Sequence, residues 1–150
     1  MNNYPIWWED TITLYNKHTG SDKKITWYRT VLHNCFWKYK SENMSVNRAT
    51  MGWYSIQLDT KSIVCRIPKN DKFLSKAEWN NSDHTSCFTL SPGDIIIRGE
   101  VDLDIDEYTA GKRSSEITSN RDLYESITIE TVSVNVGTGK GNEHYKVTGE

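Results

Sequence analysis

The stretch that decides the fold is Phe88–Asp106, FTLSPGDIIIRGEVDLDID. Its residues Ser91–Asp94 are typical of a type II turn, in which proline presets φ at the second position and glycine accepts a positive φ at the third. The isoleucines at 95–97 predict a short strand that is buried on both faces. Gly99 then indicates a bulge or a close approach between two backbones.

The end of the stretch alternates aliphatic and acidic residues, which predicts a further strand with one apolar and one acidic face. A calcium loop that starts at Asp102 fails on spacing, because its sixth position is Glu107 where glycine is required and its twelfth is Arg113 where glutamate is required. We therefore expect the polar outer face of a barrel strand, suited to meeting basic residues of another subunit. The acidic face comprises Asp102, Asp104 and Asp106.

Composition limits the class of protein. A chain of 150 residues fits one domain, and a net charge of −2 does not mark the whole surface for binding nucleic acid or anionic membrane, although it is compatible with a modest local basic patch. No apolar run approaches the roughly 20 residues that span a bilayer, and the first residues do not resemble a secretory signal. We therefore expect that the protein is made in the cytoplasm and that it does not associate with a membrane. Cys35, Cys65 and Cys87 form no CxxC pair and are interpreted as small buried hydrophobic residues.

The rest of the chain shows the alternating apolar and polar residues, and the turn signals between them, that are typical of a small all-β domain. In the run 25–39 strict alternation places Cys35 and Leu32 on opposite faces of one strand. Because both faces carry apolar residues, this strand is expected to be central. Polar stretches predict a loop at 41–52, a turn at 59–61 and a long mobile loop at 107–126. Outside the quoted stretch, the runs expected to be strands are 11–16, 25–39, 53–58, 62–67 ending at Pro68, 127–136 and 144–147.

Two local signals refine this scheme. Ser75 and Glu78 form a capping box that starts a short helix at Lys76, with Trp79 expected to cover one end of a barrel. The apolar parity of 127–136 changes near Glu130, which predicts a bulge, and 144–147 is expected to be an edge strand. The sum is about seven strands and one helix. We expect an all-β, β-dominated fold, a small antiparallel β-barrel or sandwich with one short helix and long loops, as a single domain over 1–150.

None of the candidate motifs for phosphate or metal binding has the spacing that its chemistry requires. Gly137–Gly141 lacks the first glycine, the hydroxyl residue and the helix of a phosphate loop, and the four histidines show no metal-ligand spacing. We expect no enzyme, no catalytic or cofactor-binding residue and no metal. The chain is instead rich in Trp and Tyr, six and eight against three Phe, which suits protein interfaces. The candidate subunit-interface residues are Trp7, Trp8, Trp53 and Tyr54 together with Asp102, Asp104 and Asp106.

An OB-like module that binds single-stranded nucleic acid is the competing interpretation, because small barrels with exposed aromatic residues stack bases. The aromatic residues lie among acids as often as among bases, and the three aspartates at 102, 104 and 106 would repel phosphates. Salt-sensitive binding of single-stranded DNA discriminates between the two interpretations.

Several motifs in one collinear order carry a resemblance. They are DTITLYN at 10–16, YRTVL at 28–32 with Phe36 and Trp37, FLSKAEW at 73–79, FTLSPGD at 88–94 with RGE at 98–100, and HYKV at 144–147. With them the chain resembles the small minor-capsid proteins encoded in the head and neck gene clusters of tailed bacteriophages, especially those of Firmicutes. The resemblance covers most of the chain.

This resemblance implies a structural protein of the virion, a head-closure or head-tail connector component of the neck; tail completion and a minor capsid role are the alternatives within the particle. It implies a ring of identical subunits, expected to be dodecameric, between portal or adaptor and tail proteins. Genomic DNA would pass through the channel without specific binding. In such a ring, we expect the loops 41–52 and 107–126 to reach the tiers above and below.

Overall fold

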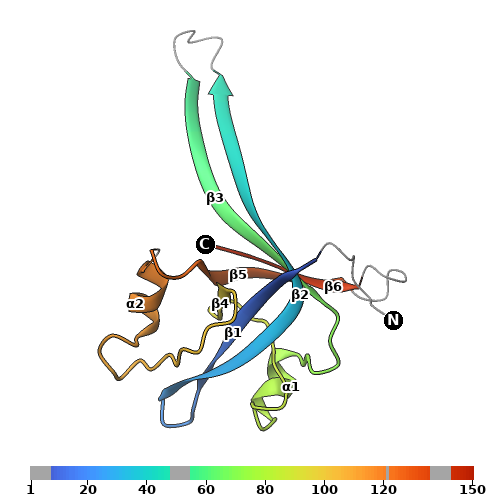
Figure 1. Cartoon of the computed structure of the whole chain (residues 1–150), viewed down its shortest axis with the longest axis vertical. Helices are drawn as coiled ribbons and strands as arrows, with labels where there is room; N and C mark the ends of the chain where they lie inside the picture. The colour runs from blue at the N-terminus through green and yellow to red at the C-terminus, as the bar shows by residue number, and fades with distance from the viewer. Residues whose placement is uncertain (1–7, 48–54, 121, 136–142) are drawn as a thin grey trace.

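A computed structural model describes residues 8–47, 55–120, 122–135 and 143–150 of the chain, with the backbone alone for 40–47 and 55–61. Within these residues six strands close into an antiparallel barrel in the order β1-β2-β3-β6-β5-β4 (Figure 1). The strands are β1 Asp10–Thr19, β2 Ile25–Asn47, β3 Ser55–Pro68, β4 Ile95–Arg98, β5 Ser126–Asn135 and β6 His144–Gly149. Two short helices, α1 Lys76–Asn80 and α2 Ser114–Ser119, complete the described elements. The expected small all-β barrel is confirmed.

The quoted stretch closes the barrel. In the turn before β4 the Asp94 N–H donates to the Ser91 carbonyl over 3.1 Å, and Gly93 has φ +98°, as predicted. Ile96 pairs with β1 on one side and β5 on the other and lies in the barrel core. Its neighbours Ile95 and Ile97 are buried on the outer side, so the prediction of a strand covered on both faces is confirmed.

A buried carboxylate ties this turn to β1. One oxygen of Asp94 accepts from the Lys17 N–H over 2.9 Å, and the other accepts from the Asn16 side-chain amide over 2.9 Å and the Ser91 N–H over 3.1 Å. The same Asn16 amide donates to the Thr89 carbonyl over 2.6 Å. These bonds, here called the Asp94 bracket, fix the entry to β4 because the buried Asp94 carboxylate would otherwise have no hydrogen-bond donor.

Strand β2 turns a corner that strict alternation did not predict. Asn34 has φ +59°, a left-handed conformation that Asn tolerates better than most residues. The register with β1 shifts there, since Ile12 faces Leu32 but Asp10 faces Cys35. Leu32 and Cys35 therefore lie in the same core cluster, and their expected placement on opposite faces is wrong.

Beyond this corner β2 and β3 form a long two-stranded ribbon that leaves the barrel (Figure 1). Its pairing runs without a shift from Phe36 opposite Arg66 to Asn47 opposite Ser55. The expected loop at 41–52 is therefore strand as far as Asn47, and the expected turn at 59–61 is strand as well. Strand β3 ends at Pro68, as predicted from the missing N–H of proline.

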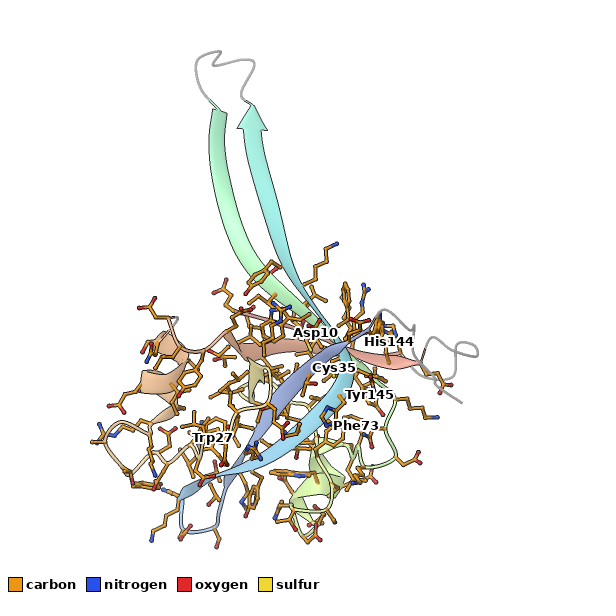
Figure 2. All side chains as sticks on the ribbon, in the orientation of Figure 1. Asp10, Trp27, Cys35, Phe73, His144 and Tyr145 are labelled. Carbon is orange, nitrogen blue, oxygen red and sulfur yellow. The ribbon has the colours of Figure 1, made fainter. Side chains whose placement is uncertain are left out.

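The last two strands complete the closure. The register between β5 and β6 shifts between Ile129 and Thr131, which confirms the predicted bulge. Strand β6 pairs with β3 as well as β5, so the expectation that it is an edge strand is wrong. Tyr145 of β6 stacks on Phe73, with ring centroids 4.2 Å apart (Figure 2). A closed barrel has no free edge at this position.

Helix α1 begins as the capping box predicted. The Ser75 hydroxyl accepts from the Glu78 N–H, and Trp79 is fully buried. Its indole packs edge-on against His18 of β1 and Tyr28 of β2, each 5.8 Å away between ring centroids. Trp79 thus packs on the barrel wall near the β1–β2 turn and is not a member of the barrel core cluster, so its expected role as a cover for one end of the barrel stays a prediction.

The segment between β4 and β5 is a second packed layer, not the mobile loop that its polarity suggested. It contains α2, so the described residues hold two short helices where the sequence predicted one. Trp27 of β2 donates its indole N–H to Glu107 over 3.1 Å and lies on the side of the barrel that this segment covers (Figure 2). The buried members of this outer cluster are Tyr15, Ile95, Ile97, Ile105 and Ile117.

Candidate interaction surfaces

The acidic segment 101–106 is not a strand in the structure, which corrects the prediction from its alternation. Side chains of β1 and β2 take the place of a neighbouring strand. The Tyr15 hydroxyl donates to the Leu103 carbonyl over 2.6 Å, and the Arg29 Nε donates to the Val101 carbonyl over 2.7 Å. Burial is the main cause that raises the pKa of Tyr15 to about 12, so this donor stays protonated at neutral pH.

The three aspartates nevertheless point away from the outer cluster, as the alternation predicted. Asp102 and Asp104 are exposed, whereas Asp106 is partly buried. Asp106 accepts from the Tyr108 N–H over 2.9 Å and from the Thr109 hydroxyl over 2.7 Å, and these bonds lower the pKa of its carboxyl group. Asp106 is therefore a local turn-forming residue, and only Asp102 and Asp104 of this set offer free carboxylates to another molecule.

The aromatic candidates are distributed differently. Trp8 is only 5% exposed; it stacks on Phe36 at 6.1 Å and meets the His144 ring edge-on at 5.7 Å between centroids. Trp8 therefore packs within its own subunit, and its contribution to an interface stays a prediction. The candidates Trp7, Trp53 and Tyr54 lie outside the described residues.

An ionic cluster fixes the point where the ribbon leaves the barrel. The Arg98 guanidinium lies 3.2 Å from an Asp10 oxygen and 3.2 Å from a Glu125 oxygen. The Tyr39 hydroxyl donates to the same Glu125 oxygen over 2.5 Å, and the other Asp10 oxygen accepts from the Trp37 N–H over 3.1 Å. We call Asp10, Tyr39, Arg98 and Glu125 the Arg98 clamp. Its partly exposed ion pairs add little to stability, but its contacts link β1, β4 and the residue before β5 to Tyr39 at the base of the ribbon.

The free part of the ribbon, here called the arm, comprises Lys40–Asn47 of β2 and Ser55–Ser62 of β3. Strand β1 stops pairing with β2 at Cys35, and β6 first pairs with β3 at Ile63, so among the described strands neither outer edge of the arm has a partner. Seven residue steps of about 3.3 Å give the arm a length of about 23 Å. An isolated two-stranded ribbon is only marginally stable in water, so the arm relies on its continuity with the barrel at its base.

The end of the barrel under α1 gathers aromatic rings and two histidines. The His18 and His84 rings lie 4.4 Å apart, and the Lys76 ammonium lies 4.8 Å from the centre of the Trp79 ring. Burial, then His84 and Lys76, lower the pKa of His18. Among the described residues no three His, Cys, Asp or Glu side chains are grouped to hold a metal ion. This arrangement is a packed cluster of aromatic and histidine rings.

The three cysteines differ in their burial. Cys35 and Cys65 are fully buried in the barrel core, as predicted, and burial raises the pKa of both thiols. Cys87 was expected to be buried as well, but it is partly exposed, and its sulfur lies 3.1 Å from the Ser82 hydroxyl. None of the helices in the described part of the chain is long and apolar enough to cross a membrane.

Together these features define a small closed β-barrel that carries a packed outer layer on one side and projects an unpartnered arm. The chain belongs to a family described as a family of unknown function (DUF6751), whose model matches residues 7–150. No curated protein and no solved structure gives a match.

Proposed function

We propose that this chain is a structural protein of the virion of a tailed bacteriophage, a subunit of a head-closure or connector ring in the neck. The proposal starts from the five collinear motifs between Asp10 and Val147 that resemble neck-cluster proteins. The barrel supplies a rigid body and the arm supplies the means to reach a neighbour. Tail completion and a minor capsid position are finer assignments of the same structural class.

The observation that carries the proposal is the arm. A monomeric domain gains nothing from about 23 Å of paired backbone with two open edges, because such edges promote unwanted association. In a ring, the same edges face identical subunits at a fixed distance, and open strands become assembly contacts.

The exposed carboxylates fit a channel through which DNA slides. Asp102 and Asp104 are held outward by the backbone contacts of their segment, so they present negative charge that repels phosphates. Tyr39, 56% exposed, donates its hydroxyl to the Glu125 carboxylate, and Tyr108, 62% exposed, accepts a bond from the Ile25 N–H at its hydroxyl. Base stacking on Tyr39 would be opposed by the adjacent carboxylate, which favours the structural role over single-strand binding.

The test is the composition and shape of the particle. Mass spectrometry of purified virions should detect the chain at a constant ratio to the portal protein. Disruption of its gene should yield DNA-filled heads without tails, or heads that leak DNA. Normal infectious particles that lack the chain would overturn the proposal.

A further inference from the structure

The register of the ribbon assigns every arm residue to one of two faces. Trp37 opposite Cys65 lies in the barrel core, and the pairing continues without a shift to Asn47 opposite Ser55. Residues two apart on a strand share a face, and directly opposite residues on paired strands share it too. The face that is buried in the barrel can therefore be followed into the arm.

The apolar residues change faces along this ribbon. In the arm, the face that continues from Trp37 is entirely polar: Ser41, Asn43, Ser45 and Asn47 on β2, and Lys61, Asp59, Gln57 and Ser55 on β3. The opposite face has Met44 paired with Leu58 and Val46 paired with Ile56, beyond a polar base of Lys40, Glu42, Thr60 and Ser62. We call the four residues Met44, Val46, Ile56 and Leu58 the apolar block.

The change of face identifies a second contact. A ribbon that only extended the barrel core would keep its apolar residues on the face of Trp37. The apolar block instead lies on the face that continues from the outside of the barrel. The arm has four adjacent apolar residues on one face and only polar residues on the other, which is the pattern of a half-buried ribbon. The apolar face must be covered by residues that do not belong to the barrel core.

The charged residues of the arm indicate which kind of molecule covers the apolar block. Within the arm Lys40 and Lys61 are balanced by Glu42 and Asp59, and the sequence between its two strands adds only the single charge of Arg48. A nucleic acid or an anionic membrane selects strongly basic ribbons, whereas two identical arms with nearly balanced charges approach each other with little repulsion. The open edges on both sides of the arm also match the backbone spacing of an identical ribbon.

We propose that the apolar block packs against a second copy of this chain and is the main self-association contact of the protein. The inference deepens the proposed ring, on which its biological setting rests, by naming the face that is buried and its occupant. The polar face of the arm then stays in solvent.

A matched pair of double variants tests this. Val46→Lys with Ile56→Glu places an opposite-charge pair on the apolar face, and Ser45→Lys with Gln57→Glu places the same pair one register step away on the polar face. Opposite charges across a strand pair preserve the ribbon in both. In sedimentation experiments over a concentration series of the full chain, the first variant should weaken self-association at least tenfold and the second less than twofold. Equal effects of the two variants, or a wild-type chain that stays monomeric throughout, would overturn the inference.

Photo-crosslinking keeps the test independent of solubility. A benzophenone amino acid at position 44 should give an adduct between two copies of the chain within particles or infected cells, whereas the same probe at position 43 should not. An adduct only with a different protein or with lipid would refute self-association. If the chain crosslinks to itself but is missing from purified virions, the neck assignment fails and the inference stands. If it is in the neck but position 44 gives no self-adduct, the inference fails and the neck assignment stands.

Discussion

Removal of the Asp94 carboxylate should destabilise the barrel more than any other single change of a polar residue in the quoted stretch. Asp94 is 1% exposed and accepts three hydrogen bonds, from the Lys17 N–H, the Ser91 N–H and the Asn16 amide. In Asp94→Ala all three donors lose this acceptor, although the Asn16 amide keeps its bond to Thr89. The entry to β4 then loses its anchor on β1.

The magnitude follows from these contacts. A buried hydrogen bond to a charged group contributes about 1.5–3 kcal/mol. Three such losses do not add, because the substitution also removes the cost of burying the charge, and burial is the main cause that raises the pKa of Asp94. We expect the free energy of unfolding to fall by about 2–4 kcal/mol. At about 2–4 °C per kcal/mol for a chain of this size, the melting temperature should fall by about 4–16 °C.

Urea unfolding followed by tryptophan fluorescence measures this change, with Asp94→Asn as the second variant. Asparagine keeps the volume but turns one acceptor into a donor that faces another N–H, so it should also be clearly destabilising. The exposed Asp102→Ala is the control and should unfold like wild type. If both Asp94 variants lie within about 0.5 kcal/mol of wild type, the bracket is not a stabilising element and the reasoning is refuted.

Four further outcomes are expected. Trp79→Ala, at a fully buried position, should lower the free energy of unfolding by about 3–5 kcal/mol in the same urea assay. The lowered pKa of His18 means that, as the pH falls below about 6.5, the unfolded chain takes up a proton before the folded chain does. The contribution of neutral His18 to stability is therefore present above that pH and is lost below it. The variant His18→Gln should flatten the acid side of a plot of melting temperature against pH. Calcium should leave the melting temperature unchanged, and a rise would reveal a site near Asp102 and Asp104. Single-stranded DNA should show no salt-sensitive binding by anisotropy, and micromolar binding that weakens with salt would instead support the nucleic-acid module.

The parts of the fold that the sequence predicted correctly are governed by near neighbours. The Ser91–Asp94 turn needs only its proline and glycine, and the start of α1 needs only Ser75 and Glu78. The bulge in β5 is visible as a change of parity within the strand itself. Each of these signals is complete within a few residues, so no knowledge of the tertiary structure was required.

The errors arise where a distant partner decides the conformation. Residues 41–47 look like a loop because one face of that strand is polar, and their strand conformation depends on pairing with Ser55–Lys61. The acidic segment 101–106 has the period of a strand but no strand beside it. In the Arg98 clamp, Asp10 lies 88 residues from Arg98 and Glu125 lies 27 residues away, so nothing local marks the cluster.

The uninterrupted course of β2 has a mechanical consequence. The same polypeptide forms the arm, turns at Asn34 and continues as the neighbour of β1, with no loop between these parts. Tension applied along the arm is therefore carried along the strand axis into the barrel wall. Hydrogen bonds that lie across that axis are loaded together in shear, whereas a sideways pull would open them one after another. The barrel should consequently resist axial pulling at forces that would peel the same ribbon apart.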